Sequence, residues 1–211
     1  MLCGLIKIRP YINQPLPPNP CMRIVSGSAG GLHLKVPKGH KVRPTADQVR
    51  EAIFNILASR FSLADITVLD LFAGTGALGI EALSRGARSA VFVDASPEAQ
   101  RVIQTNLNIT GLRRQGRIIR AYALKGIKVA EEQEWRFGGV FLDPPYGEGW
   151  VDKTLRLLAR SPILEPGAWI VVEHGQHEEG AEAYPPLVLT DRRRYGTTGV
   201  SFYQRQGEEA A

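Results

Sequence analysis

The chain has 211 residues, of which 44% are hydrophobic and 22% charged, so it is long enough to bury one good-sized core. No apolar run approaches the length of a membrane span, and two cysteines, Cys3 and Cys21, supply neither a disulfide framework nor a Cys-rich metal site. The formal net charge of +5 favours an anionic partner, and a reducing cytoplasm is the expected location.

Residues 1–21 contain five prolines and no periodic pattern, which predicts an extended or disordered leader. An alternative hypothesis is that the protein starts at Met22. Residues 22–36 alternate around a cluster of glycines and predict a hairpin. Thr45 then caps a predicted helix, with a glutamine three residues later and an apolar face behind it.

Residues 22–60 are therefore expected to form a small basic appendage. The main domain is predicted over residues 61–206, followed by a tail at 207–211. Six basic residues and one acid lie between Met22 and Arg50, and a second basic cluster comprises Arg113, Arg114, Arg117 and Arg120. The alternative interpretation of either cluster is a solvated protein face.

From residue 66 onward, apolar strands alternate with amphipathic helices, which predicts βαβ units and a parallel sheet. We expect strands at 66–71, 89–94, 117–121, 138–143 and 168–173, and helices at 77–85, 97–109, 123–132 and 151–160. No helix separates the last two strands, predicted at 187–194 and 200–205, so this pair must be antiparallel. The α/β layout resembles the Rossmann-like, seven-stranded sheet of the class I S-adenosylmethionine-dependent methyltransferases.

The run from Asp70 to Gly79 leads from a strand through glycines into a helix, which suits a nucleoside cofactor. Its G-x-G-x-x-G pattern also permits a dinucleotide. Asp70 favours S-adenosylmethionine, because a carboxylate repels a pyrophosphate but pairs with an ammonium group. Asp94 closes the next strand and is placed to accept hydrogen bonds from ribose hydroxyls. The alternative for both acids is helix capping.

Class I methyltransferases often hold the adenine amino group with an acid after the third strand, where this chain has Tyr122. Adenine recognition is therefore expected to use backbone groups, or the tyrosine hydroxyl or ring. The predicted cofactor contacts on this side of the sheet are Asp70, Phe72, Gly74, Gly76, Gly79, Asp94, Ala95, Tyr122 and Ala123.

The tetrapeptide Asp143-Pro144-Pro145-Tyr146 ends another apolar strand, and is the predicted catalytic motif. Asp143 and the carbonyl of Pro144 can each accept an N–H of an amine attached to an aromatic base. Pro145 stiffens the loop, and Tyr146 offers a ring for stacking on the base. The alternative is a simple strand-terminating turn. The four histidines show no ligand spacing, so no metal is predicted.

The tetrapeptide does not name the base, since adenine N6, cytosine N4 and guanine N2 are all methylated with it. The chain has no room for a separate target-recognition domain, so an already shaped RNA is the expected target.

The joint set of motifs resembles the RsmD family, bacterial methyltransferases of guanine N2 in 16S ribosomal RNA. The resemblance covers residues 22–205 and rests on Met22-Arg23-Ile24-Val25-Ser26-Gly27, Val42-Arg43-Pro44-Thr45 with the following helix, both motifs above, and Tyr195-Gly196. It implies a target in the small ribosomal subunit or its assembly intermediate. A monomer is expected. The resemblance adds Thr45 to the cofactor site, and the predicted RNA contacts are Arg23, Lys35, Lys41, Arg43 and Arg50.

Three other hypotheses stay open from the sequence. The first is an adenine-N6 or cytosine-N4 methyltransferase acting on nucleic acid. The second is a catalytically silent RNA-binding assembly factor that keeps the fold. The third is a nicotinamide oxidoreductase, which leaves Asp70 and the Asp-Pro-Pro-Tyr loop without a role.

Overall fold

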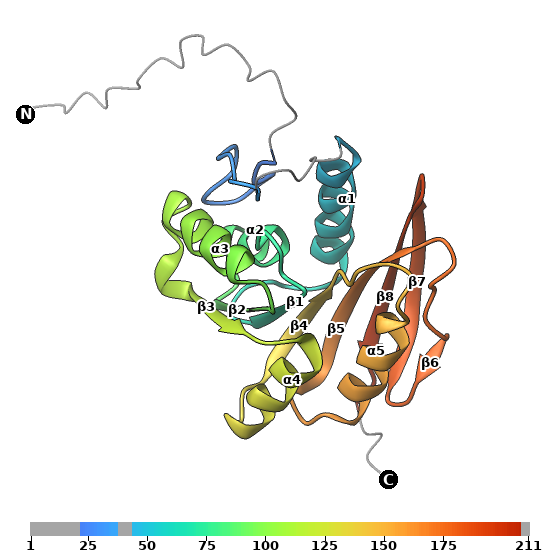
Figure 1. The fold of residues 1–211 in the computed structure, drawn as a ribbon. Helices are drawn as coiled ribbons and strands as arrows, with labels where there is room; N and C mark the ends of the chain where they lie inside the picture. The colour runs from blue at the N-terminus through green and yellow to red at the C-terminus, as the bar shows by residue number, and fades with distance from the viewer. Residues whose placement is uncertain (1–21, 38–43, 208–211) are drawn as a thin grey trace, which may run out of the picture.

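The computed structural model describes residues 22–37 and 44–207, apart from the side chains of residues 44–46. Five α-helices and eight strands follow one another in the described part of the chain (Figure 1). The helices are α1 (Pro44–Arg60), α2 (Ala77–Ser84), α3 (Pro97–Ile109), α4 (Ala123–Glu132) and α5 (Trp150–Arg160), with a 3-10 turn η1 (Arg113–Gln115). The strands are β1 (Thr67–Leu71), β2 (Ser89–Asp94), β3 (Gly116–Arg120), β4 (Phe137–Leu142), β5 (Leu164–Gly175), β6 (Ala183–Tyr184), β7 (Leu187–Tyr195) and β8 (Thr198–Arg205).

All eight strands form one sheet in the order β3-β2-β1-β4-β5-β8-β7-β6. The first five pair in parallel, as expected for strands joined by crossover helices. The strands β8, β7 and β6 continue the sheet in antiparallel pairs. The strand order reverses between β1 and β4, and ligands in open α/β sheets bind beyond the carboxyl ends of the strands at such a point.

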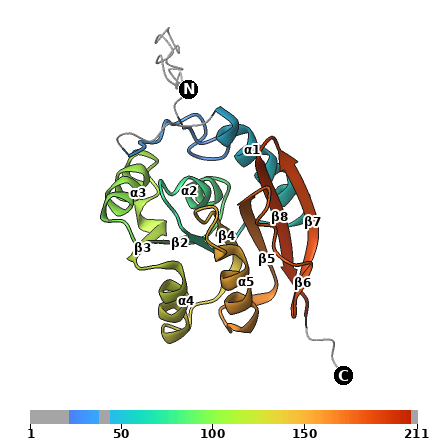
Figure 2. The ribbon, with the colours of Figure 1, turned by 45° about the vertical axis from the view of Figure 1, so that its right-hand side comes forward.

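Helices cover both faces of the sheet. Side chains along each strand point alternately to one face and to the other. On one face, α1, α2 and α3 pack over side chains such as Val68 and Phe92. On the other, α4 and α5 pack over side chains such as Leu69 and Val93. Figures 1 and 2 show this separation, with α1 to α3 above the sheet and α4 and α5 below it.

Residues 22–37 form a hairpin-like loop that joins the core of the first face. Arg23 and His33 make one antiparallel bridge, and the loop has no longer regular strand among its described residues. Its buried side chains Ile24, Ala29 and Leu34 share a hydrophobic cluster with α1, α2 and α3. The predicted boundary between an appendage and a main domain stays a prediction, but this segment and the sheet are packed into one core.

The structure bears out the predicted α/β class and differs in one detail of the sheet. Eight strands are present in the described residues, because the two-residue strand β6 pairs with β7 outside the seven predicted ones. Two residues are too few to show an alternating pattern, so the sequence carries no signal for β6. Among the described helices, none is both long and apolar enough to cross a membrane.

Candidate active site

A cavity of about 340 Å³ lies at the carboxyl edge of the sheet, beside the point where the strand order reverses. Its walls come from the segments that follow β1, β2, β3 and β4. Seven predicted site residues line it, namely Phe72, Asp94, Ala95, Tyr122, Ala123, Asp143 and Pro145. Residues more than seventy positions apart in the chain therefore share one space, as expected from the parallel strands.

Asp94 fastens the glycine turn after β1 to the end of β2. Its Oδ2 accepts the backbone N–H of Gly74 at 2.9 Å, and its Oδ1 accepts that of Ser96 at 2.8 Å. Each carboxylate oxygen keeps a further acceptor position, because a carboxylate offers about four. Asp94 can therefore hold the turn and still accept hydrogen bonds from a ligand in the cavity.

The backbone between β1 and α2 is wound through unusual conformations. Phe72 has φ of 60°, in the left-handed region that non-glycine residues seldom adopt, and Gly76 has φ of 76° at the start of α2. Strain of this kind gathers at ligand sites, where surrounding contacts hold it in place. At Phe72 the turn presents an aromatic ring to the cavity wall.

Asp70 is buried, with 2% of its surface exposed, and does not line the cavity. Its Oδ2 accepts the N–H of Gly79 at 2.9 Å, within the first turn of α2, which corresponds to the capping alternative drawn from the sequence. A Cβ at Gly79 would overlap the ring of Phe92 and stand 3.1 Å from Asp70 Oδ2, so only glycine permits this approach. Burial, together with the nearby charge of Asp94, raises the pKa of Asp70 to about 8, against the lowering effect of the Gly79 hydrogen bond.

The Asp-Pro-Pro-Tyr loop follows β4 and contributes to the cavity wall. Asp143 is exposed and lines the cavity together with Pro145, while Pro144 is buried. The hydroxyl of Tyr146 donates to Glu173 Oε1 at 3.4 Å, and its ring lies against Gly175, where a Cβ would stand 3.5 Å from the ring. The end of β5 thus positions the tyrosine, leaving 39% of its surface exposed.

Of the four lining residues that the sequence did not single out, Val93 and Ala121 lie beside predicted ones, and Glu148 and Trp150 complete the cavity. Trp150 Nε1 donates to Glu148 Oε2 at 2.7 Å, and the Trp150 and Phe72 rings lie 5.9 Å apart at an angle of 60°. Tyr122, which is 73% exposed, adds a third aromatic side chain to the lining. The one available signal was sequence proximity, since both residues lie within seven positions of Asp143.

Other predicted contacts lie outside the cavity lining. Gly74, Gly76 and Gly79 shape the turn and the helix behind it, and Pro144 and Tyr146 belong to the loop that carries Asp143. The side chain of Thr45 is outside the described residues, as are Lys41 and Arg43. Arg23 and Lys35 have exposed side chains on the N-terminal loop.

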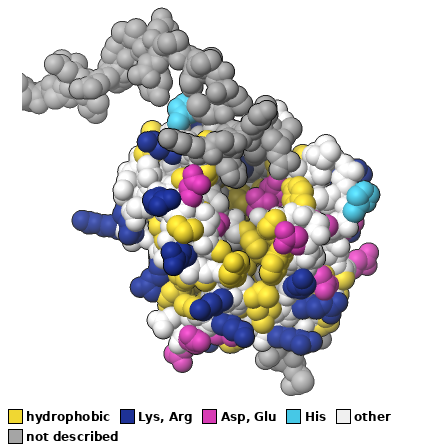
Figure 3. All heavy atoms as spheres, viewed as in Figure 1, with side chains coloured by type: hydrophobic (Ala, Val, Ile, Leu, Met, Phe, Trp, Pro, Cys, Tyr) yellow, Lys and Arg dark blue, Asp and Glu magenta, His cyan; other side chains and the backbone are white. Residues whose placement is uncertain are grey.

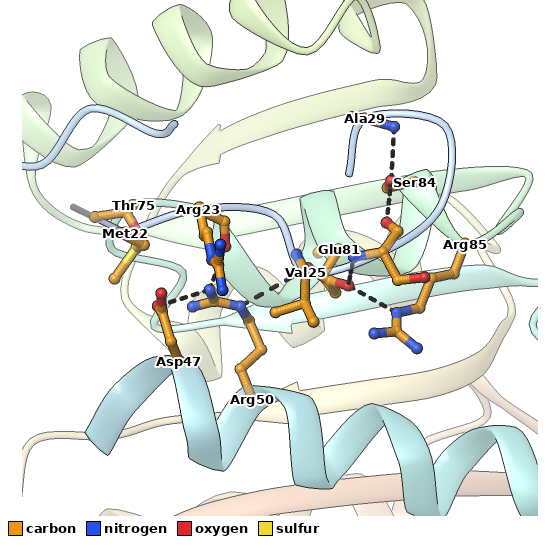
Figure 4. Close-up of polar contacts among 12 residues, drawn as sticks. Met22, Arg23, Val25, Ala29, Asp47, Arg50, Thr75, Glu81, Ser84 and Arg85 are labelled. Atoms are coloured by element: carbon orange, nitrogen blue, oxygen red, sulfur yellow. Dashed lines mark hydrogen bonds and ion pairs between the residues drawn. The ribbon is translucent and has the colours of Figure 1, made fainter. Parts of the chain in front are cut away.

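Arg50 and Glu81 lock the N-terminal loop onto α1 and α2 (Figure 4). The Glu81 side chain is fully buried and accepts the N–H groups of Val25 at 2.7 Å and Ser26 at 3.0 Å. Arg50 is 4% exposed, forms ion pairs with Asp47 at 2.9 Å and Glu81 at 3.8 Å, and donates to the carbonyl of Arg23. Arg50 therefore has a structural role, which corrects the prediction that it contacts RNA.

Asn106 on α3 ties the same loop to the glycine turn. It is fully buried; its Nδ2 donates to the carbonyls of Lys35 at 3.0 Å and Thr75 at 2.9 Å, and its Oδ1 accepts the N–H of Lys35 at 2.7 Å. Thr75 Oγ1 also donates to Met22 Sδ at 3.2 Å. Both ends of the loop are thus connected to the residue between Gly74 and Gly76.

The described histidines occupy surface and core positions. His174 is buried between the carbonyl of Gly175 and the hydroxyl of Ser201, whereas His33 and His177 are exposed. His40 is outside the described residues. Within residues 22–37 and 44–207, no group of three or more histidines, cysteines and acids is arranged to hold a metal ion.

The strand order, the antiparallel closing strands and the cavity at the switch point define a Rossmann-like class I methyltransferase fold. Residues 22–204 match the family model described as "Conserved hypothetical protein 95". The chain belongs to this family, the RsmD-type methyltransferases.

Individual relatives match the chain over nearly their whole length. The Bacillus subtilis protein YlbH is 40% identical over 186 residues, covering 88% of this chain and 100% of the relative. The Escherichia coli ribosomal RNA small subunit methyltransferase D is 34% identical over 193 residues, covering 90% of this chain and 94% of the relative. The solved structure of the Escherichia coli protein yhhF superimposes with a TM-score of 0.76 at 32% identity, covering 89% and 99% of the two chains.

Proposed function

We propose that this protein transfers the methyl group of S-adenosylmethionine to the exocyclic N2 amine of a guanine in 16S ribosomal RNA. The observation that carries the proposal is that Asp94 and Asp143 line one cavity, so the acid proposed to hold the cofactor and the acid proposed to bind the amine face the same space. The RNA class is supported by the name of the Escherichia coli relative, a ribosomal RNA small subunit methyltransferase.

The residues of the cavity fit S-adenosylmethionine. A volume of about 340 Å³ falls in the range of small-molecule sites, and Phe72, Tyr122 and Trp150 offer aromatic surface for a purine. Asp94 offers free acceptor positions for ribose hydroxyls. The bound cofactor supplies an activated methyl group on a sulfonium. Asp70 acts on this site through the backbone of Gly79, and the direct ammonium contact drawn from the sequence stays a prediction.

Asp143 and the carbonyl of Pro144 are proposed to bind the amine. The guanine N2 lone pair is delocalised into the ring, so the two N–H bonds must be held while the nitrogen turns toward the methyl group. Asp143 accepts one N–H and stabilises the positive charge that develops on the nitrogen; the Pro144 carbonyl accepts the other. Tyr146, anchored at Glu173 and packed on Gly175, keeps part of its ring exposed for stacking on the base.

Recognition of the RNA is proposed to use phosphate contacts. Arg23 and Lys35 are exposed on the N-terminal loop, and Lys41 and Arg43 follow it in the chain. This loop is joined to the glycine turn through Asn106, so RNA contact and cofactor site are physically connected. We propose that the protein acts as a monomer on the small subunit or its assembly intermediate, in the cytoplasm.

The test is methyl transfer from labelled S-adenosylmethionine to unmodified small ribosomal subunits and to protein-free 16S RNA, with the modified nucleoside identified by mass spectrometry. N2-methylguanine on subunits supports the donor, the base and the substrate together. Methyladenine or methylcytosine as the sole product contradicts the choice of base. RNA binding without any product indicates the silent assembly factor instead.

A further inference from the structure

A surface rich in arginine lies at the amino edge of the sheet, away from the cavity. Two adjoining hollows of about 470 and 580 Å³ meet at Gly116 and Arg117, where β3 begins. Six arginines line them, and we call this surface the arginine groove: Arg88, Arg101, Arg113, Arg114, Arg117 and Arg136. All six side chains are exposed. Figure 3 shows Lys and Arg side chains gathered on the side of the molecule where β3 lies.

The charges of the groove are not neutralised by ion pairs among the described residues, although Arg88, Arg113 and Arg136 each donate a hydrogen bond to a neutral group. None of the six guanidinium groups has an ion pair within 4.0 Å among the described residues, although six other arginines of the chain do. Among the described residues, two acids line the hollows, Glu134 and Glu165, and both belong to the larger one. The groove is therefore a concave surface with an excess of four positive charges, six arginines less two glutamates, which attracts an anion.

Protection of the sheet edge does not account for the whole groove. Strand β3 is an edge strand, and charged side chains such as Arg117 do discourage the pairing of such an edge with another chain. Arg88, Arg101 and Arg136, however, come from the segment before β2, from α3 and from the segment before β4. Side chains from separate elements converge on the two hollows, which edge protection alone does not require.

The chemistry of the groove is that of phosphate recognition. No lysine of residues 22–37 or 44–207 lines either hollow, and the planar guanidinium group matches two phosphate oxygens at once, which an ammonium group does not. Arg117 lies over the ring of Trp135, with 4.8 Å between Cζ and the ring centroid, and this stacking orients the group. Such a row of arginines fits the phosphodiester backbone of a nucleic acid.

We propose that the arginine groove binds the phosphate backbone of the same RNA whose base enters the cavity, which makes it a second contact surface at a distance from the chemistry. This inference rests on the proposed function. Ser89 at the start of β2 lines the groove and Asp94 at its end lines the cavity, so the two sites are roughly 17 Å apart along a six-residue strand. Exposed Arg120 ends β3 next to Ala121, which lines the cavity, and continues the positive surface between them.

The test compares the full-length double variant Arg114→Ala/Arg136→Ala with Lys128→Ala/Arg160→Ala, which removes two exposed charges from α4 and α5. The dissociation constant for fluorescently labelled, protein-free 16S RNA is measured over a series of salt concentrations. The groove variant is expected to bind about tenfold more weakly at low salt, and the slope of log K against log salt is expected to fall by about 2. The control variant keeps the wild-type slope, and both variants keep wild-type affinity for S-adenosylmethionine by calorimetry.

Equal RNA affinity and salt slope in the two variants overturn the groove proposal, even if the wild type methylates RNA normally. Weaker binding to assembled subunits with unchanged binding to protein-free RNA also overturns it, because the partner would then be a ribosomal protein. Failure of the proposed function is recognised separately, since the wild type itself would form no N2-methylguanine.

Discussion

The carboxyl oxygen Oδ2 of Asp70 accepts the backbone N–H of Gly79 at 2.9 Å, and joins the end of β1 to the first turn of α2 beneath the cavity. The carboxyl is 2% exposed, and burial raises its pKa from 3.8 to about 8. A group whose pKa is higher in the folded than in the unfolded state stabilises the fold fully below the unfolded value, and this stability is lost as the pH rises through the folded value.

Asp70→Asn is expected to flatten the pH dependence of stability, because the amide keeps the shape and the acceptor oxygen but does not titrate. Between pH 6 and 8 the wild type is expected to lose up to about 1.4 kcal/mol per pH unit relative to this variant. Urea unfolding of both proteins at half-unit pH steps measures the difference. Parallel stability curves over that range would contradict the raised pKa.

Asp143→Ala is expected to lower kcat by about two orders of magnitude or more, with little change in the affinity for S-adenosylmethionine, because the carboxylate acts on the amine in the transition state. Single-turnover kinetics on small subunits and calorimetry with the cofactor separate the two effects. Glu132→Ala at the exposed end of α4 serves as the control. A normal rate in Asp143→Ala would remove Asp143 from the catalytic role.

Trp150→Ala is expected to weaken S-adenosylmethionine binding about tenfold, since the ring forms a wall of the cavity and packs on Phe72. Trp150→Phe retains most of the aromatic surface and should recover most of the affinity. Calorimetric titration with the cofactor measures both variants, and thermal unfolding checks that α5 still forms. Unchanged affinity in the alanine variant would exclude Trp150 from the cofactor site.

Asn106→Leu is expected to destabilise the protein by about 2–4 kcal/mol, because three backbone groups of Lys35 and Thr75 lose their buried partner. Limited proteolysis should cut the loop of residues 22–37 faster than in the wild type. Asn108→Leu, an exposed position on the same helix, is the matched control. Equal cleavage rates in the two variants would show that Asn106 does not hold the loop.

Much of the fold and part of the site followed from local patterns. The predicted strand 89–94 and helices 97–109 and 123–132 have the bounds observed in the structure, since apolar periodicity and capping residues mark them clearly. Asp94 and Asp143 share a cavity because parallel strands bring their carboxyl ends to one edge. That placement depends on the direction of the strands, which the alternation of strands and helices implies.

Arg50 is a residue whose role could not be predicted from local sequence patterns. In sequence it belongs to a basic segment that resembles an RNA-binding surface, but Glu81, 31 residues later on α2, lies buried beside it and accepts backbone N–H groups of the same loop. No spacing along the chain encodes this contact, because it depends on how α1 packs against α2. Glu148 and Trp150 were missed for a similar reason, since their place in the cavity depends on the path of the loop after β4.

The sequence by itself determined the α/β class, the two motifs and the residues predicted to bind a nucleoside and an amine, because periodicity, glycine turns and strand ends are local properties of the chain. The tertiary structure alone decided which ionisable groups are buried inside the protein, such as Arg50 and Asp70, and which remain exposed, such as the six arginines of the groove. Burial and ion pairing arise from contacts between segments distant in sequence, and these exist only once the helices have packed on the sheet.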